Sequence, residues 1–139
     1  MTDAVEFARA VHPARADEAQ RMRHEARDWL AGLDIDQDAR ERVLTAVSEA
    51  VENACEHAYP GDDTEGTVEL TLWCEKDAVN VRVTDNGQWS EGSTPAGPGS
   101  HARRGRGFVL MHRSVDSVAI RHSAGGTTVA LRQHRAPAP

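Results

Sequence analysis

The chain is poor in lysine, cysteine and aromatic residues, and each scarcity excludes a class of protein. Lys76 is the single lysine among 16 basic residues, which excludes a phosphate loop built on a lysine. The two cysteines, Cys55 and Cys74, have neither metal-ligand spacing nor the density of a disulfide scaffold, so we expect reduced, half-buried packing residues. Six aromatic residues and an apolar content of 39% fit an ordinary globular protein.

Long apolar runs and a basic excess are also lacking. No run approaches the roughly 20 apolar residues that span a bilayer, and the N-terminus, with Asp3 and Glu6, lacks a signal-peptide pattern. The net charge of −6 disfavours a nucleic-acid surface, because such binding requires a basic face. We therefore expect a cytoplasmic protein with one domain over residues 1–135 and a disordered tail over 136–139.

Hydrophobic periodicity predicts a chain that mixes strands with two main helices. The predicted helices cover 16–30, 37–58 and, as a short turn, 108–111; the predicted strands cover 5–11, 67–74, 79–85, 117–121 and 127–131. Gly32 ends the first helix and Asp36 precedes the second as its N-cap. Residues 87–104, rich in Gly, Ser and Pro, are too long for an ordinary connection, so we interpret them as a lid.

The segment Ser48-Glu49-Ala50-Val51-Glu52-Asn53-Ala54 places a carboxylate and a carboxamide four residues apart on one face of the second helix. The amide oxygen of Asn53 suits magnesium, which takes few protein ligands and completes its shell with water and phosphates. Glu49, one turn earlier, could accept a proton during phosphoryl transfer. Taken alone, the same pattern also fits an exposed polar helix face.

Asp85-Asn86-Gly87 stands at the end of a predicted strand. There the carboxylate of Asp85 can accept a hydrogen bond from an exocyclic amine, while Gly87 lets the backbone approach a flat ring. Adenine satisfies this geometry. A simple Asp-Asn-Gly turn is the alternative, and for an isolated tripeptide it is the better interpretation.

Gly105-Arg106-Gly107 opens the predicted short helix, where backbone amides and the helix dipole favour a phosphate. Arg103, Arg104 and Arg106 crowd the same point. A solvated loop or an RNA-binding Arg-Gly tract are the alternatives, and the acidic chain without interleaved aromatics makes RNA the weaker one. We therefore count Arg104, Gly105 and Gly107 as nucleotide-binding candidates.

In order and spacing, these elements together with Gly126-Thr127-Thr128 resemble the N, G1, G2 and terminal threonine motifs of the GHKL (Bergerat-fold) ATPase superfamily. The short length of the chain and the sequence of the Glu49–Ala54 segment resemble the anti-sigma-factor serine/threonine kinase branch. The resemblance implies an α/β architecture: a two-layer α+β sandwich with helices on one face of a mixed, mostly antiparallel sheet and a flexible ATP lid.

The same resemblance implies residue roles. It carries the general base onto Glu49, magnesium coordination onto Asn53, and the adenine contact onto Asp85 with Gly87 beside it. It carries phosphate contacts onto Gly105 and Gly107. A second adenine-side contact falls on Thr127. One departure is Trp89, which stands where the G1 motif commonly has a second glycine.

The resemblance also implies partners. An ATP-dependent kinase of this branch acts as an anti-sigma factor: it binds an alternative sigma factor and phosphorylates an anti-anti-sigma (STAS-type) protein. Such kinases are commonly homodimers through their sheets, and Arg23, expected on the exposed side of the first helix, is a candidate partner contact. The alternative function is a nucleotide-dependent regulatory module that sequesters a partner without phosphorylating it.

Overall fold

The computed structural model describes residues 7–57, 66–86, 110–123 and 126–135. Its helices and strands follow one another in the order β1 (Phe7–Pro13), α1 (Ala16–Ala31), α2 (Gln37–His57), β2 (Thr67–Cys74), β3 (Ala78–Asp85), β4 (Ser117–Ser123) and β5 (Gly126–His134). The types and order predicted from the sequence are confirmed for these elements. The predicted short helix appears as one turn over residues 110–114, and its first residues, like the predicted lid and tail, lie outside the described residues.

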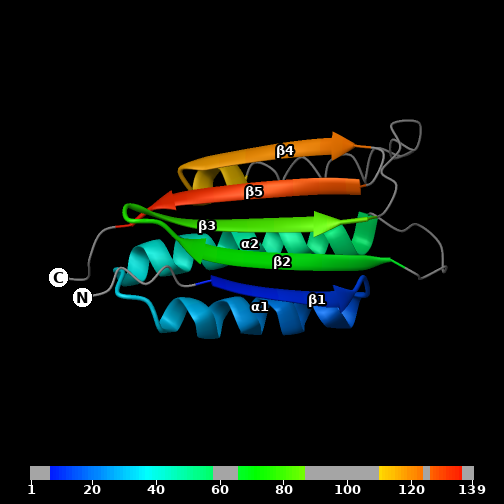
Figure 1. The fold of residues 1–139 in the computed structure, drawn as a ribbon, viewed down its shortest axis with the longest axis horizontal. Helices are drawn as coiled ribbons and strands as arrows, with labels where there is room; N and C mark the ends of the chain where they lie inside the picture. The colour runs from blue at the N-terminus through cyan, green and yellow to red at the C-terminus, as the bar shows by residue number, and fades with distance from the viewer. Residues whose placement is uncertain (1–6, 58–65, 87–109, 124–125, 136–139) are drawn as a thin grey trace.

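The five strands form one sheet in the order β1-β2-β3-β5-β4. All four neighbouring pairs are antiparallel, and β2 with β3 forms the expected hairpin. Both α1 and α2 lie against the same face of this sheet (Figure 1). The expectation of a two-layer sandwich with a mostly antiparallel sheet and helices on one face is therefore confirmed.

The core lies between the two layers and follows from two periodicities. Along the strands, alternate residues face the helices. Along the helices, residues three and four apart form one buried stripe. The fully buried side chains include Met22, Leu30, Val43, Val47, Leu70, Val81 and Val83. Cys55 and Cys74 belong to this core and are buried, so the half-buried positions expected for them were wrong.

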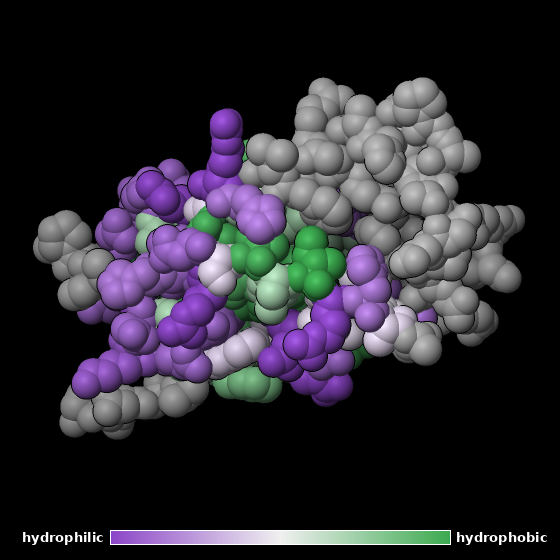
Figure 2. Space-filling view, turned by 90° about the horizontal axis from the view of Figure 1, so that it is seen from above, coloured by the Kyte–Doolittle hydropathy of each residue, from purple (hydrophilic) through white to green (hydrophobic). Residues whose placement is uncertain are grey.

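The β4 edge closes the core only in part. Figure 2 views the molecule from this side and shows apolar residues gathered near the middle of the face, with polar residues around them. Leu110, in the short helical turn, is 41% exposed. Val118 and Ile120 of β4 are partly buried against the core.

A histidine on β1 fastens this edge strand to α1. Glu18 in the first turn of α1 and Glu25, two turns later, hold His12 between them: its Nδ1 lies 2.9 Å from Glu18 Oε1 and its Nε2 lies 2.8 Å from Glu25 Oε1. Arg15 precedes α1 without a side-chain cap. Glu18 near the N-terminus also favours the helix electrostatically, because the helix dipole is positive there.

Candidate nucleotide site

The apolar rows of the sheet end in a polar row beside α2. On the helix-facing side, Val83 pairs with Val129, and the next row along consists of Asp85, Thr127 and His122 on β3, β5 and β4. Asp85 and Thr127 are each only 3% exposed. This row lies where β3 ends and β5 begins, at the same end of the molecule as the last turns of α2 (Figure 1).

Two backbone features hold the row in register. Gly126 starts β5 at φ 141°, and a Cβ placed there would lie 1.8 Å from the Asp85 carbonyl oxygen. Only glycine allows this close approach. On the other side, the backbone N–H of Thr67 donates to Asn86 Oδ1 at 2.9 Å, which ties the end of β3 to the start of β2. Asp85 is therefore held from both neighbouring strands.

A small cavity lies between this row and α2. Asn53, Asp85 and Thr127 supply its polar wall; the apolar wall consists of Ala50, Ala54, Val83, Ile120 and Val129. Its volume is about 10 Å³, close to the space that a single water needs.

Asn53 is the polar residue that α2 contributes. Its side chain is half-buried, and its Nδ2 atom is buried without a hydrogen-bond partner in the described part of the chain. A buried amide donor without a partner is costly, and a water or a ligand in the adjoining cavity would satisfy it. Asn53, which was predicted from the sequence as a site residue, thus lines the same cavity as Asp85 and Thr127.

The structure brings together three of the predicted site residues. Glu49 is half-buried one turn before Asn53 on α2, and it is not among the residues that line the cavity. Gly87, Arg104, Gly105 and Gly107 lie outside the described residues, as does Trp89. Sequence reasoning missed His122, whose Nδ1 lies 3.0 Å from Thr127 Oγ1.

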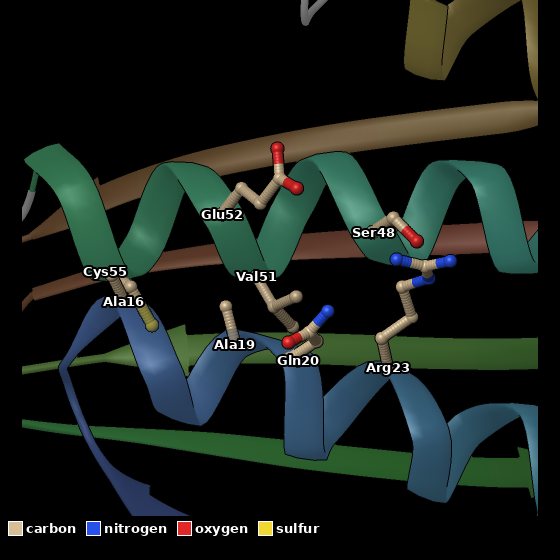
Figure 3. A pocket seen from close by; sticks show the side chains of 8 residues that line it. All are labelled: Ala16, Ala19, Gln20, Arg23, Ser48, Val51, Glu52 and Cys55. Carbon is tan, nitrogen blue, oxygen red and sulfur yellow. The ribbon is translucent and has the colours of Figure 1, made fainter.

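A larger hollow, of about 220 Å³, lies between α1 and α2. Figure 3 shows Arg23 of α1 reaching toward Ser48 of α2, with Glu52 and Cys55 farther along the same helix. Arg23 is half-buried in this groove, so the exposed position expected for it was wrong. The groove contains none of Asn53, Asp85 and Thr127, so its size alone does not make it the nucleotide site.

The described residues contain no group of three or more His, Cys, Asp and Glu side chains that could hold a metal ion. An all-protein metal cage is therefore not found in this part of the chain. The amide oxygen of Asn53 still fits a magnesium ion whose remaining ligands are phosphate oxygens and water. In the same described residues, no helix is long and apolar enough to cross a membrane.

Known proteins that are similar in sequence identify the family of this chain. The family model of the histidine kinase-like ATPase domain matches residues 12–133. The anti-sigma F factor of Geobacillus kaustophilus is 32% identical over 87% of both chains. That of Bacillus subtilis is 33% identical over 76% of this chain and 77% of its own.

Solved structures agree as well. The crystal structure of the RsbU and RsbW domains of Rv1364c from Mycobacterium tuberculosis matches with a TM-score of 0.73 and 27% identity, over 96% of this chain and 34% of that one. The histidine kinase domain of a blue-light activated kinase from Erythrobacter litoralis matches in fold alone, with a TM-score of 0.56 and 18% identity over 87% of this chain and 60% of that one. The chain therefore belongs to the histidine kinase-like ATPase family, in the branch that contains the anti-sigma F factors.

Proposed function

We propose that this chain is an ATP-dependent serine/threonine protein kinase that acts as an anti-sigma factor. The observation that carries the proposal is the meeting of Asn53, Asp85 and Thr127 at one cavity, although they are far apart in the sequence. The residue types of Asp85 and Thr127 suit a nucleobase, and that of Asn53 suits the magnesium ion that accompanies the phosphates. The similarity to anti-sigma F factors over most of their length supports the anti-sigma part of the proposal.

Each wall of the cavity suits one part of ATP. The carboxylate of Asp85 accepts a hydrogen bond from the exocyclic amine of adenine, and the Thr127 hydroxyl is beside it in the same row. Val83 and Val129 offer apolar surface to the ring. Gly87 is the proposed neighbour of the adenine ring beside Asp85, and Arg104, Gly105 and Gly107 are the proposed contacts to the phosphates.

Asn53 holds magnesium in this proposal through its amide oxygen. When bound, the ion neutralises negative charge on the phosphates. Glu49 lies one helical turn away on the same helix, where it can hold a proton without also being the metal ligand.

The reaction is the transfer of the terminal phosphoryl group to a hydroxyl of the partner protein. The hydroxyl oxygen forms a bond to the γ-phosphorus, and the bond from that phosphorus to the oxygen bridging it to the β-phosphate breaks, so that ADP leaves. Glu49 accepts the hydroxyl proton. Asp85 and Thr127 hold the nucleobase and take no part in proton transfer.

The proposed partners are an alternative sigma factor, an anti-anti-sigma protein of the STAS type, and a second copy of this chain. Because a sigma factor acts in transcription, the proposed location is the cytoplasm.

The sheet face opposite the helices supports the proposed homodimer. On edge strand β1, Phe7 is 62% exposed and Val11 is 52% exposed, and both lie on this face, where a second copy could cover them. Replacing both with serine is expected to shift the sedimentation of the protein toward the monomer.

The kinase proposal is tested with the full chain, magnesium and γ-labelled ATP, and the anti-anti-sigma candidates encoded near its gene. We expect transfer of label to a partner serine or threonine. Glu49→Gln should lower the transfer rate by a factor of about 100 to 10,000 while ATP affinity is retained. Glu52→Gln, at an exposed carboxylate three residues later on the same helix, is the matched control and should leave the rate unchanged.

Two results would contradict the proposal. Tight ATP binding without transfer to any candidate would leave a nucleotide-dependent binding module in place of a kinase. Equal transfer rates for Glu49→Gln and the parent chain would show that Glu49 is not the base. Another group would then have to accept the hydroxyl proton.

A further inference from the structure

The polar row at the nucleotide cavity contains a third member that the motifs do not include. His122 on β4 pairs with Thr127 on β5, and its Nδ1 atom lies 3.0 Å from the Thr127 hydroxyl oxygen. His122 itself is exposed, whereas Thr127 is 3% exposed. The histidine therefore contacts from outside a hydroxyl whose other side is at the cavity.

We propose that His122 is a positioning residue that fixes the direction of the Thr127 hydroxyl and thereby the choice of purine. The inference rests on the proposed function, because it assumes that a nucleobase enters this cavity. It concerns 6-aminopurine nucleotides, such as ATP, against 6-oxopurine nucleotides, such as ITP.

The donors and acceptors of the site decide which purine it favours. An ionised Asp85 only accepts hydrogen bonds, so it matches the amine of a 6-aminopurine and repels the oxygen of a 6-oxopurine. On the same edge, the ring nitrogen next to the amine is an acceptor in a 6-aminopurine and a donor in a 6-oxopurine. Thr127 must therefore donate its proton if both residues are to select the same base.

A threonine hydroxyl can point its one proton either way. When Nδ1 of His122 carries a proton, it donates to the Thr127 oxygen, and the hydroxyl proton is left for the nucleobase. When Nδ1 lacks a proton, the hydroxyl donates to His122 instead, and Thr127 offers the base only an acceptor. With Nδ1 of His122 protonated, Thr127 therefore selects the same purine as Asp85.

The experiment measures the affinities of the full chain for ATP and ITP by calorimetry, with magnesium present. We expect the parent chain to prefer ATP. His122→Leu should reduce that preference by about 2- to 10-fold, as expected when one neutral hydrogen bond is lost. His122→Asn, whose amide can donate from nearly the same place as Nδ1, should restore most of it, and Arg121→Ala, exposed on the same strand with its side chain on the other face, should not change it.

A double-mutant cycle separates positioning from simple packing. With Thr127→Val as background, His122→Leu should have no further effect on the ATP to ITP ratio, because both act through one hydroxyl. An unchanged ratio in His122→Leu, or additive effects in the cycle, would overturn the role of His122 while leaving ATP binding in place. A parent chain that binds neither nucleotide would overturn the proposed function as well.

Discussion

Gly126 is the position where a single methyl group should damage both the fold and the site. An added Cβ would lie 1.8 Å from the Asp85 carbonyl oxygen, and ordinary contact begins at 3.4 Å. The start of β5 would have to move away from β3 by roughly 1.6 Å, a displacement typical of overpacked sites that cost about 1–3 kcal/mol. The φ of 141° adds about 1–2 kcal/mol for a residue with a Cβ.

Gly126→Ala is therefore expected to lower the free energy of unfolding by about 2–5 kcal/mol, a large part of the stability of a typical domain. Urea unfolding followed by circular dichroism measures this change. ATP affinity should fall as well, because Thr127 is the next residue and its register with Asp85 is disturbed.

Gly32→Ala is the matched control. There the added Cβ would lie 3.6 Å from the Trp29 carbonyl oxygen, an ordinary contact, and Gly32 has a helical φ of −86°. This variant should be neutral or more stable by about 0.4–1 kcal/mol, because alanine restricts the unfolded chain. If both alanine variants unfolded at the same urea concentration as the parent, the close approach of Gly126 to Asp85 would not limit the stability of the fold.

Three further outcomes are expected. Burial opposes protonation of His12, but its hydrogen bonds to two carboxylates outweigh this and raise its pKa above the ordinary value. Stability from this group is therefore full below about pH 6.5 and is lost as the pH rises through the raised pKa. Urea midpoints should show this pH dependence in the parent and in His24→Gln, exposed on α1, but not in His12→Gln. Asp85→Asn should weaken ATP binding by about 10- to 100-fold in calorimetry, because a hydrogen bond to a charged acceptor is lost. Met22→Ala, at a fully buried side chain, should lower the free energy of unfolding in urea by about 2–5 kcal/mol. The ATP affinity of the variant should be unchanged under conditions in which it is fully folded.

Much of the fold was predictable because its elements carry strong local patterns. The alternation in β2 and β3 and the 3.6-residue stripe of α2 are visible in the sequence, and the apolar residues of these patterns form the core. The ends of elements were less predictable. β5 extends to His134 because Gln133 and His134 continue the ladder with β3, a pairing that local residue preference does not show.

Arg23, Cys55 and Cys74 are more buried than their local sequence predicts, because tertiary packing covers them. Helical periodicity places Arg23 away from the sheet, and this placement predicts an exposed side chain only if nothing else packs there. The groove between α1 and α2 half-covers Arg23, and the same packing buries Cys55. Such packing between two helices depends on their relative placement, which their separate patterns do not specify.

The candidate site was predictable as a set of residue types but not as a row. Asp85 and Thr127 could be selected from their motifs, whereas their register across β3 and β5 is a property of the sheet. His122 illustrates the difference. Nothing near it in the sequence suggests a ligand, but the short connection between Ser123 and Gly126 places it opposite Thr127.

The separation of Glu49 from the cavity assigns different parts of the proposed function to different elements. In the proposed function, Asp85 and Thr127, which are held by the sheet register, bind the nucleobase whether or not phosphate is transferred. In the same proposal, Glu49, on α2 one turn before Asn53, serves phosphoryl transfer alone. A chain of this family could therefore lose the base and still respond to nucleotide. Because Asn53 lines the cavity and is the proposed magnesium ligand, Asn53→Ala should impair both ATP binding in magnesium and phosphoryl transfer, whereas binding measured in excess chelator should change little.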